Sequence, residues 1–143
     1  MQLLDELAQA VHELAVAVAC LAEAYELVDE GLADRLEKRL FAPTQAAYAR
    51  ARRAQVEFAS RVGLSDPPGA PASSGTHSPD PRDYLQRELE SVQRADTLIA
   101  ELQDSMLPVE VGDRELRDGL SESRSLIAEV PGRTRELLRT VGR

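Results

Sequence analysis

Few side chains in this 143-residue sequence belong to the types that commonly carry out chemistry. It has two histidines, His12 and His77, and one cysteine, Cys20. A di-iron helical bundle needs inward glutamates with Glu-x-x-His pairs, but Gln9 and Ser74 stand three residues before the two histidines. One thiol and two distant histidines are also too few for a structural zinc site. We therefore predict no metal site and no cofactor.

The residue pairs needed for covalent or acid–base catalysis are also missing. Cys20 and His12 are about 12 Å apart along a helix, which is too far for a hydrogen-bonded pair. Acid pairs such as Glu23 with Glu26 fall on an acidic helix face, which is typical of a solvated surface. The sequence has no G-x-S-x-G motif and no phosphate-binding loop. We expect a non-enzymatic protein in which Cys20 is a small buried residue.

Arginines and one serine remain as candidates for binding or regulation. Arg50, Arg53 and Arg61 make the second predicted helix the most basic part of the chain. They either pair with carboxylates of the first or fourth helix across the bundle rim, or form a docking patch for an acidic protein segment. Ser78 precedes Pro79 and is a candidate phosphorylation site in a linker; a plain tether is the alternative.

The composition favours helices and disfavours several partners. The sequence is 43% hydrophobic but only 3% aromatic, so its core must consist mainly of Leu, Val and Ala. A net charge of −8 argues against nucleic acid and against anionic membrane surfaces. A single cysteine suits a reducing compartment. With no basic signal-peptide region and no apolar stretch long enough for a membrane span, we expect an intracellular protein, cytoplasmic or nuclear, without membrane insertion.

The first predicted helix carries an apolar seam in a regular heptad pattern. Alanines flank the seam and widen it, as in a helix that packs against several neighbours. From the middle of this seam we expect Leu14, Val18, Leu21 and Tyr25 to be core residues. The seam residues are Leu4, Leu7, Val11, Leu14, Val18, Leu21, Tyr25, Val28 and Leu32. Beyond Gly31 the pattern shifts, which predicts either a bend or an extension to Leu40, before Pro43 ends the helix.

Three further helices follow. The second spans about 44–62 and is joined to the first by a short turn at Ala42-Pro43, so the two should be antiparallel. Residues 64–80 are rich in Pro, Gly and Ser and predict a flexible linker. The third helix starts at Pro81 with Asp80 as its N-cap. The fourth keeps one apolar stripe through Pro131-Gly132, which favours a kinked continuous helix over a separate final helix capped by Thr134.

These elements predict an all-α fold, an antiparallel bundle of four helices built from two long helical hairpins. The hairpins cover residues 1–63 and 81–143, and the linker covers 64–80. A similar architecture occurs in small subunits of eukaryotic kinetochore, vesicle- or lysosome-tethering and transcription-coactivator complexes. That likeness implies a scaffold or adaptor that binds other protein subunits through helix packing.

The first helix, at about 1.5 Å per residue, is longer than its neighbours can cover. Apolar residues near its end are therefore candidates for binding a partner helix, namely Val28, Leu32, Leu36 and Leu40. Two alternatives remain: a homo-oligomeric bundle scaffold, or a bundle enzyme or ligand-binding protein. The second alternative would need an internal polar site, for which the stripes offer Gln55, Ser123 and Thr134.

Overall fold

The computed structural model describes residues 2–65, 72–105 and 113–141, which form four helical rods. The rods are α1 (Gln2–Leu27); α2 (Glu30–Leu36) with the π-helix η1 (Glu37–Phe41) and α3 (Ala42–Arg61); α4 (Pro81–Asp104); and α6 (Arg114–Leu126) with α7 (Val130–Thr140). They pack around one core and confirm the predicted all-α four-helix bundle.

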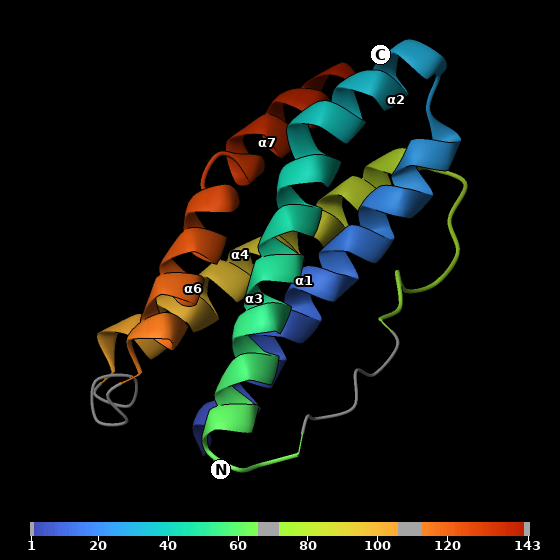
Figure 1. Cartoon of the computed structure of the whole chain (residues 1–143). Coiled ribbons are helices and arrows are strands. Elements are labelled where there is room, and N and C mark those ends of the chain that lie inside the picture. The colour runs from blue at the N-terminus through green and yellow to red at the C-terminus, as the bar shows by residue number, and fades with distance from the viewer. Residues whose placement is uncertain (1, 66–71, 106–112, 142–143) are drawn as a thin grey trace.

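The rods follow an order that requires one long connection (Figure 1). The chain runs along α1, reverses into α2 and α3, and then returns along the bundle before α4 begins, so α3 and α4 point the same way. The most extensive contacts join α1 to α4 and α3 to α6, elements from different halves of the chain. The two predicted hairpins therefore share one core.

The first turn lies earlier than the sequence analysis placed it. α1 ends at Leu27, and the Asp29 side chain caps α2 by accepting a hydrogen bond of 2.8 Å from the Leu32 amide. The turn is therefore at Val28–Asp29, and the predicted turn at Ala42-Pro43 is wrong. Gly31 belongs to the first turn of α2, close to the predicted bend.

Pro43 lies inside the second rod because the helix adapts around it. The preceding π-helix widens the backbone where the proline ring would otherwise meet the turn before it. Proline has no N–H to donate to the Arg39 carbonyl four residues earlier. That carbonyl accepts a hydrogen bond of 3.2 Å from the Arg133 guanidinium of α7 instead. A contact distant in sequence thus supports a helix that local rules end.

The core side of α1 is rotated relative to the predicted seam. Leu14 and Leu21 are fully buried, but Val18 is only half-buried and Tyr25 is 40% exposed, so Tyr25 is not a core residue. The alanine flank on the other side, together with Leu3, faces the interior; its members are Ala10, Ala17 and Ala24, all fully buried. α1 is also long and apolar enough to meet the length and hydropathy criteria for a membrane span, which a bundle's core helix meets as well.

The fourth rod has the predicted apolar stripe, but it consists of two helices and not of one. α6 and α7 are separated by a turn at 127–129, so the predicted continuous helix is wrong and two helices are present. The stripe nevertheless stays buried across the break, at Leu116, Leu120, Ser123, Ile127, Val130, Thr134, Leu137 and Val141. Tight hydrogen bonds, such as that from the Val130 amide to the Ile127 carbonyl (3.1 Å), preserve the register through the turn.

Part of the predicted flexible linker has a defined position. Residues 72–80, named the strap below, lie against α1 and α4, and the Ser78 amide donates a hydrogen bond of 2.9 Å to the Tyr84 hydroxyl. The Ser78 hydroxyl donates to Asp83 (2.6 Å) and accepts from the Asp80 amide (3.1 Å). Within the predicted linker of residues 64–80, the strap thus packs against the bundle; residues 66–71 lie outside the described residues.

Gly119 allows α3 and α6 to approach closely. A Cβ atom there would lie 2.8 Å from the Ala54 Cβ and 3.0 Å from Arg50 Nη1. Arg50 is held in place by an ion pair of 2.6 Å with Glu122. Glycine inside a helix normally weakens it by about 1 kcal/mol relative to alanine, so this residue serves packing and not helix formation.

We expect Gly119→Ala to lower the free energy of unfolding, because overpacking costs about 1–3 kcal/mol and exceeds the helix-propensity gain. Gly132→Ala in α7 is the matched control, since a Cβ there meets nothing within 4 Å. That control should stabilise the fold by about 0.4–1 kcal/mol. Urea unfolding of both variants measures the difference; stabilisation by both would show that the α3–α6 contact is not tight.

Candidate functional site

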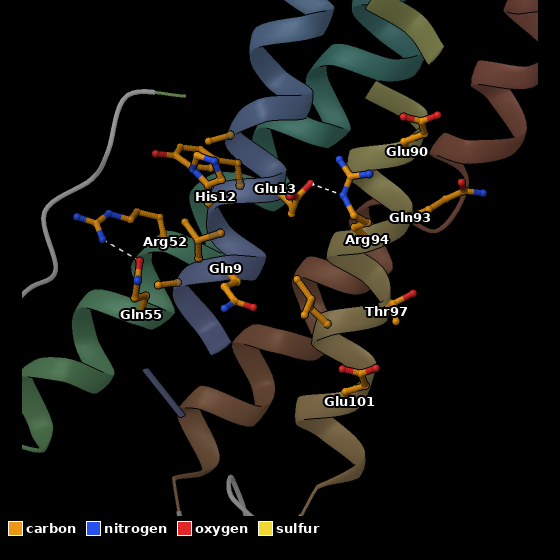
Figure 2. A pocket seen from close by; sticks show the side chains of 15 residues that line it. Gln9, His12, Glu13, Arg52, Gln55, Glu90, Gln93, Arg94, Thr97 and Glu101 are labelled. Carbon is orange, nitrogen blue, oxygen red and sulfur yellow. Dashed lines mark hydrogen bonds and ion pairs between the residues drawn. The ribbon is translucent and has the colours of Figure 1, made fainter. Parts of the chain in front are cut away.

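A groove of about 900 Å³ lies over the outer side of α1 (Figure 2). It reaches α3 on one side and α4 on the other. Its apolar lining comes from the more buried residues Ala8, Val11, Ala15 and Leu98. Exposed polar side chains form the rim, and they are Gln9, His12, Glu90, Gln93, Arg94, Thr97 and Glu101.

One ion pair between helices and two hydrogen bonds within helices hold the rim in place. Arg94 of α4 donates through Nε to Glu13 of α1 at 3.0 Å and also contacts the Ser91 hydroxyl at 3.2 Å. On the α3 side, Arg52 donates to the side-chain oxygen of Gln55 at 2.7 Å. Figure 2 shows the Glu13–Arg94 pair between α1 and α4 and the Arg52–Gln55 pair within α3. An apolar floor with a polar rim is the composition of a protein-binding surface.

The predicted partner-binding residues at the start of the second rod separate into two groups. Leu36 and Leu40 are at most 1% exposed and belong to the core, so neither lies on a surface that a partner helix could cover. Val28 and Leu32 are half-buried and line a smaller hollow of about 570 Å³ at the α1–α2 turn. The physical reason is the early turn, which folds this segment back onto the bundle.

The predicted arginine cluster forms ion pairs within the chain. Arg50 pairs with Glu122 of α6, and Arg53 lies 3.8 Å from Glu57 of its own helix. Arg61 contacts Asp113 through two hydrogen bonds of 2.7 Å and Glu115 through one of 2.8 Å. The contacts of Arg50 and Arg61 agree with pairing across the bundle rim, whereas that of Arg53 stays within α3.

Asp113 shows how tightly the Arg61 pair is held. Burial alone would raise the pKa of Asp113, but hydrogen bonds from Arg61 and from the Leu116 amide hold it below its ordinary value. The carboxylate caps the N-terminus of α6 and fastens it to the end of α3. This arginine is therefore a structural clamp between two rods.

Glu88 of α4 is a buried ionisable residue that the sequence analysis missed. Its exposed fraction is 0%, and burial raises its pKa to about 8, although a hydrogen bond with Thr134 acts in the opposite direction. The Thr134 hydroxyl lies 2.9 and 3.1 Å from the two carboxyl oxygens and 3.0 Å from the Val130 carbonyl oxygen. When Glu88 is protonated, its carboxyl group donates a hydrogen bond to the Thr134 hydroxyl. That hydroxyl then donates a hydrogen bond to the Val130 carbonyl oxygen. The sequence does contain a pattern that indicates its burial. Glu88 shares one helix face with Tyr84, Ser91 and Ala95, which follow a spacing of 4, 3 and 4 residues.

Cys20 is fully buried, as predicted, and it lies beneath the strap. Burial raises the pKa of its thiol to about 11, and its sulfur is 3.8 Å from the Ser74 carbonyl oxygen. Ser78 is only 7% exposed. A phosphate on Ser78 would lie beside the Asp83 carboxylate, so modification requires the strap to open. Cys20 can report such opening.

Replacing Glu88 with Gln should remove a pH dependence of stability. Below about pH 4.5 the carboxyl is protonated in both the folded and the unfolded chain. Because the folded pKa of Glu88 is about 8, only the unfolded chain loses its proton between these values. The wild type should therefore lose about 1.4 kcal/mol per pH unit relative to Glu88→Gln as the pH rises from 5 to 8. Urea unfolding at several pH values measures the free energy of unfolding of both proteins. A difference between the two that stays constant with pH would contradict the prediction.

Replacing Ser78 with Asp should open the strap, because it removes the bond to Asp83 and adds a like charge beside it. Losing a hydrogen bond to a charged group should raise the rate at which Cys20 reacts with a thiol reagent on the order of tenfold. His77→Asp adds the same charge at an exposed neighbour and serves as control. Equal reaction rates in the two variants would mean that the Ser78 contact does not hold the strap.

Comparison of the chain with protein-family models, with curated proteins and with solved structures found no match. The function therefore has to be argued from the described geometry. Within residues 2–65, 72–105 and 113–141 there is no group of three or more His, Cys, Asp and Glu side chains placed to hold a metal ion. The feature that offers a binding surface is the groove over α1.

Proposed function

We propose that this protein is a non-enzymatic interaction module that binds another protein in the groove over α1. The observation that supports this is the combination of an apolar floor at Ala8, Val11 and Ala15 with an exposed polar rim. Interfaces combine these features, with water excluded from the centre and hydrogen bonds at the edge. Small residues at the floor leave space into which a segment of a partner would fit.

The surroundings of the groove suit a preformed site. Glu13 and Arg94 are paired across it, and both belong to helices in extensive mutual contact. A rigid site keeps the ordering penalty of binding low. The single buried thiol suits a reducing compartment, so we place the protein inside the cell, in the cytoplasm or nucleus. Membership of a larger helical assembly, such as a tethering or coactivator complex, is the finer form of this proposal.

A homo-oligomeric scaffold is the second candidate. Tyr25 and Leu27 are 40% and 37% exposed, and they lie with half-buried Val28 and Leu32 near the α1–α2 turn. An apolar end of this kind could pair with a second copy. Light scattering over a range of concentrations separates the candidates, because a constant monomer mass eliminates the homo-oligomer.

Photo-crosslinking tests the proposed function directly. A benzophenone amino acid replaces Thr97 at the rim of the groove, and Arg135 of α7, exposed and outside the groove, is the control position. In cells that express the full chain, we expect Thr97 and not Arg135 to yield an adduct of one discrete mass. Adding Gln9→Trp, which fills the groove from an exposed position, should abolish that adduct while circular dichroism shows an intact bundle.

Three outcomes would overturn the proposal. The first is the absence of any adduct from Thr97 in a folded protein. The second is an adduct that Arg135 yields equally. The third is an adduct with twice the mass of the chain, which would replace the partner with a second copy and support the scaffold instead.

A further inference from the structure

The furrow between α1 and α4 repeats one arrangement at two levels. At one level Cys20 of α1 lies near Arg87 of α4, since both contact the Ser74 carbonyl. At the other level Glu13 lies against Arg94. On each helix the two positions are seven residues apart, which is about 10.5 Å along the axis. Because α1 and α4 are antiparallel, Arg87 lies level with Cys20 and Arg94 lies level with Glu13. The α4 edge of the furrow therefore carries an arginine at both levels.

The first level is filled by the chain's own strap. Arg87 donates through Nη1 to the carbonyl oxygens of Ser74 at 2.9 Å and of Thr76 at 2.8 Å. Gly75 lies between them with a φ of 89°, and a Cβ atom there would be 3.2 Å from Arg87 Nη1. The arginine therefore recognises backbone carbonyls of a non-helical segment made of small residues.

The second level is the α4 side of the groove, and none of the strap residues 72–80 lines it. Arg94 is 55% exposed at its side chain, and among the described residues its ion-pair partner across the furrow is Glu13. Thr97 and Leu98, further along α4, line the same side of the groove. Arg94 is therefore placed, one heptad from Arg87, where it can donate to another backbone segment.

We propose that this part of the groove binds an extended segment of a partner protein, rich in small residues, whose backbone carbonyls accept hydrogen bonds from Arg94. The inference rests on the proposed function and specifies its partner. A helix leaves carbonyls free only in its last turn, whereas an extended segment offers them along its whole length, as the strap does to Arg87. The strap of a second copy is already held by Arg87, Tyr84 and Asp83 of its own chain.

The probe is a synthetic peptide with the sequence of the strap from Ala72 to Ser78, blocked at both ends and added to the ¹⁵N-labelled full chain. The strap of the full chain occupies the first level, so the peptide should cause saturable amide shifts at the second. We expect them at Gln9, Glu13, Arg94 and Thr97, and not at Cys20 or Arg87.

Two variants test the role of the arginine. Arg94→Gln should weaken peptide binding about fivefold, the equivalent of one hydrogen bond. Glu13→Gln should strengthen it by a similar factor, because Arg94 loses its competing carboxylate. Arg135→Gln removes an exposed arginine elsewhere and should leave the affinity unchanged.

The inference is overturned if the peptide causes no shifts at millimolar concentration, if the shifts fall at Cys20 and Arg87, or if Arg94→Gln binds as well as the wild type. Its failure is distinguishable from failure of the proposed function. A discrete Thr97 adduct without peptide binding would mean that the groove binds a partner in another conformation. Loss of both signals would remove both proposals.

Discussion

The close approach of α1 and α4 is the constraint on which the rest of the structure depends. Ala10, Ala17 and Ala24 form one line along α1 and are fully buried. Small side chains let two helix backbones come near each other, and they provide little volume of their own. α1 and α4 make the most extensive contacts in the bundle. The burial of this alanine line is where α1 departs from its predicted heptad seam.

Several features follow from pairing a helix of the first half with one of the second. The chain must return along the bundle before α4 begins, and the described end of that connection, the strap, lies over the seam that the pairing creates. The strap covers the seam at Cys20, whereas no residue of 72–80 lines the groove near Glu13. Glu88 of α4 is fully buried, and α7 supplies Thr134 as its hydrogen-bond partner. α4 thus contributes both to the groove and to the burial of an acid.

The arginines show how charge supports this packing. Arg61 and Arg50 connect α3 to α6, and Arg94 connects α4 to α1. Exposed ion pairs contribute little to stability individually, so their value here is mainly geometric. They fix which helix faces meet along the rim. Arg94 differs from the others because it lies at the edge of a groove and keeps donors near open space.

The sequence by itself determined the helical class, the buried thiol, the stripe of the fourth rod and the cap at Asp80, because these depend on periodicity and on residues close together in the chain. It could not determine which flank of α1 faces the core, since leucine and alanine faces are both apolar and the choice depends on α4. It placed the first turn at Pro43, because the Arg133 contact to Arg39 that supports the rod there comes from 94 residues away. Leu36 and Leu40 became core residues, and Ser78 became part of a packed strap, for the same reason. Only the tertiary structure brings Glu88 together with Thr134 and places the edge that Arg87 and Arg94 share on α4 beside α1, because these relations exist only once α1, α4 and α7 have packed.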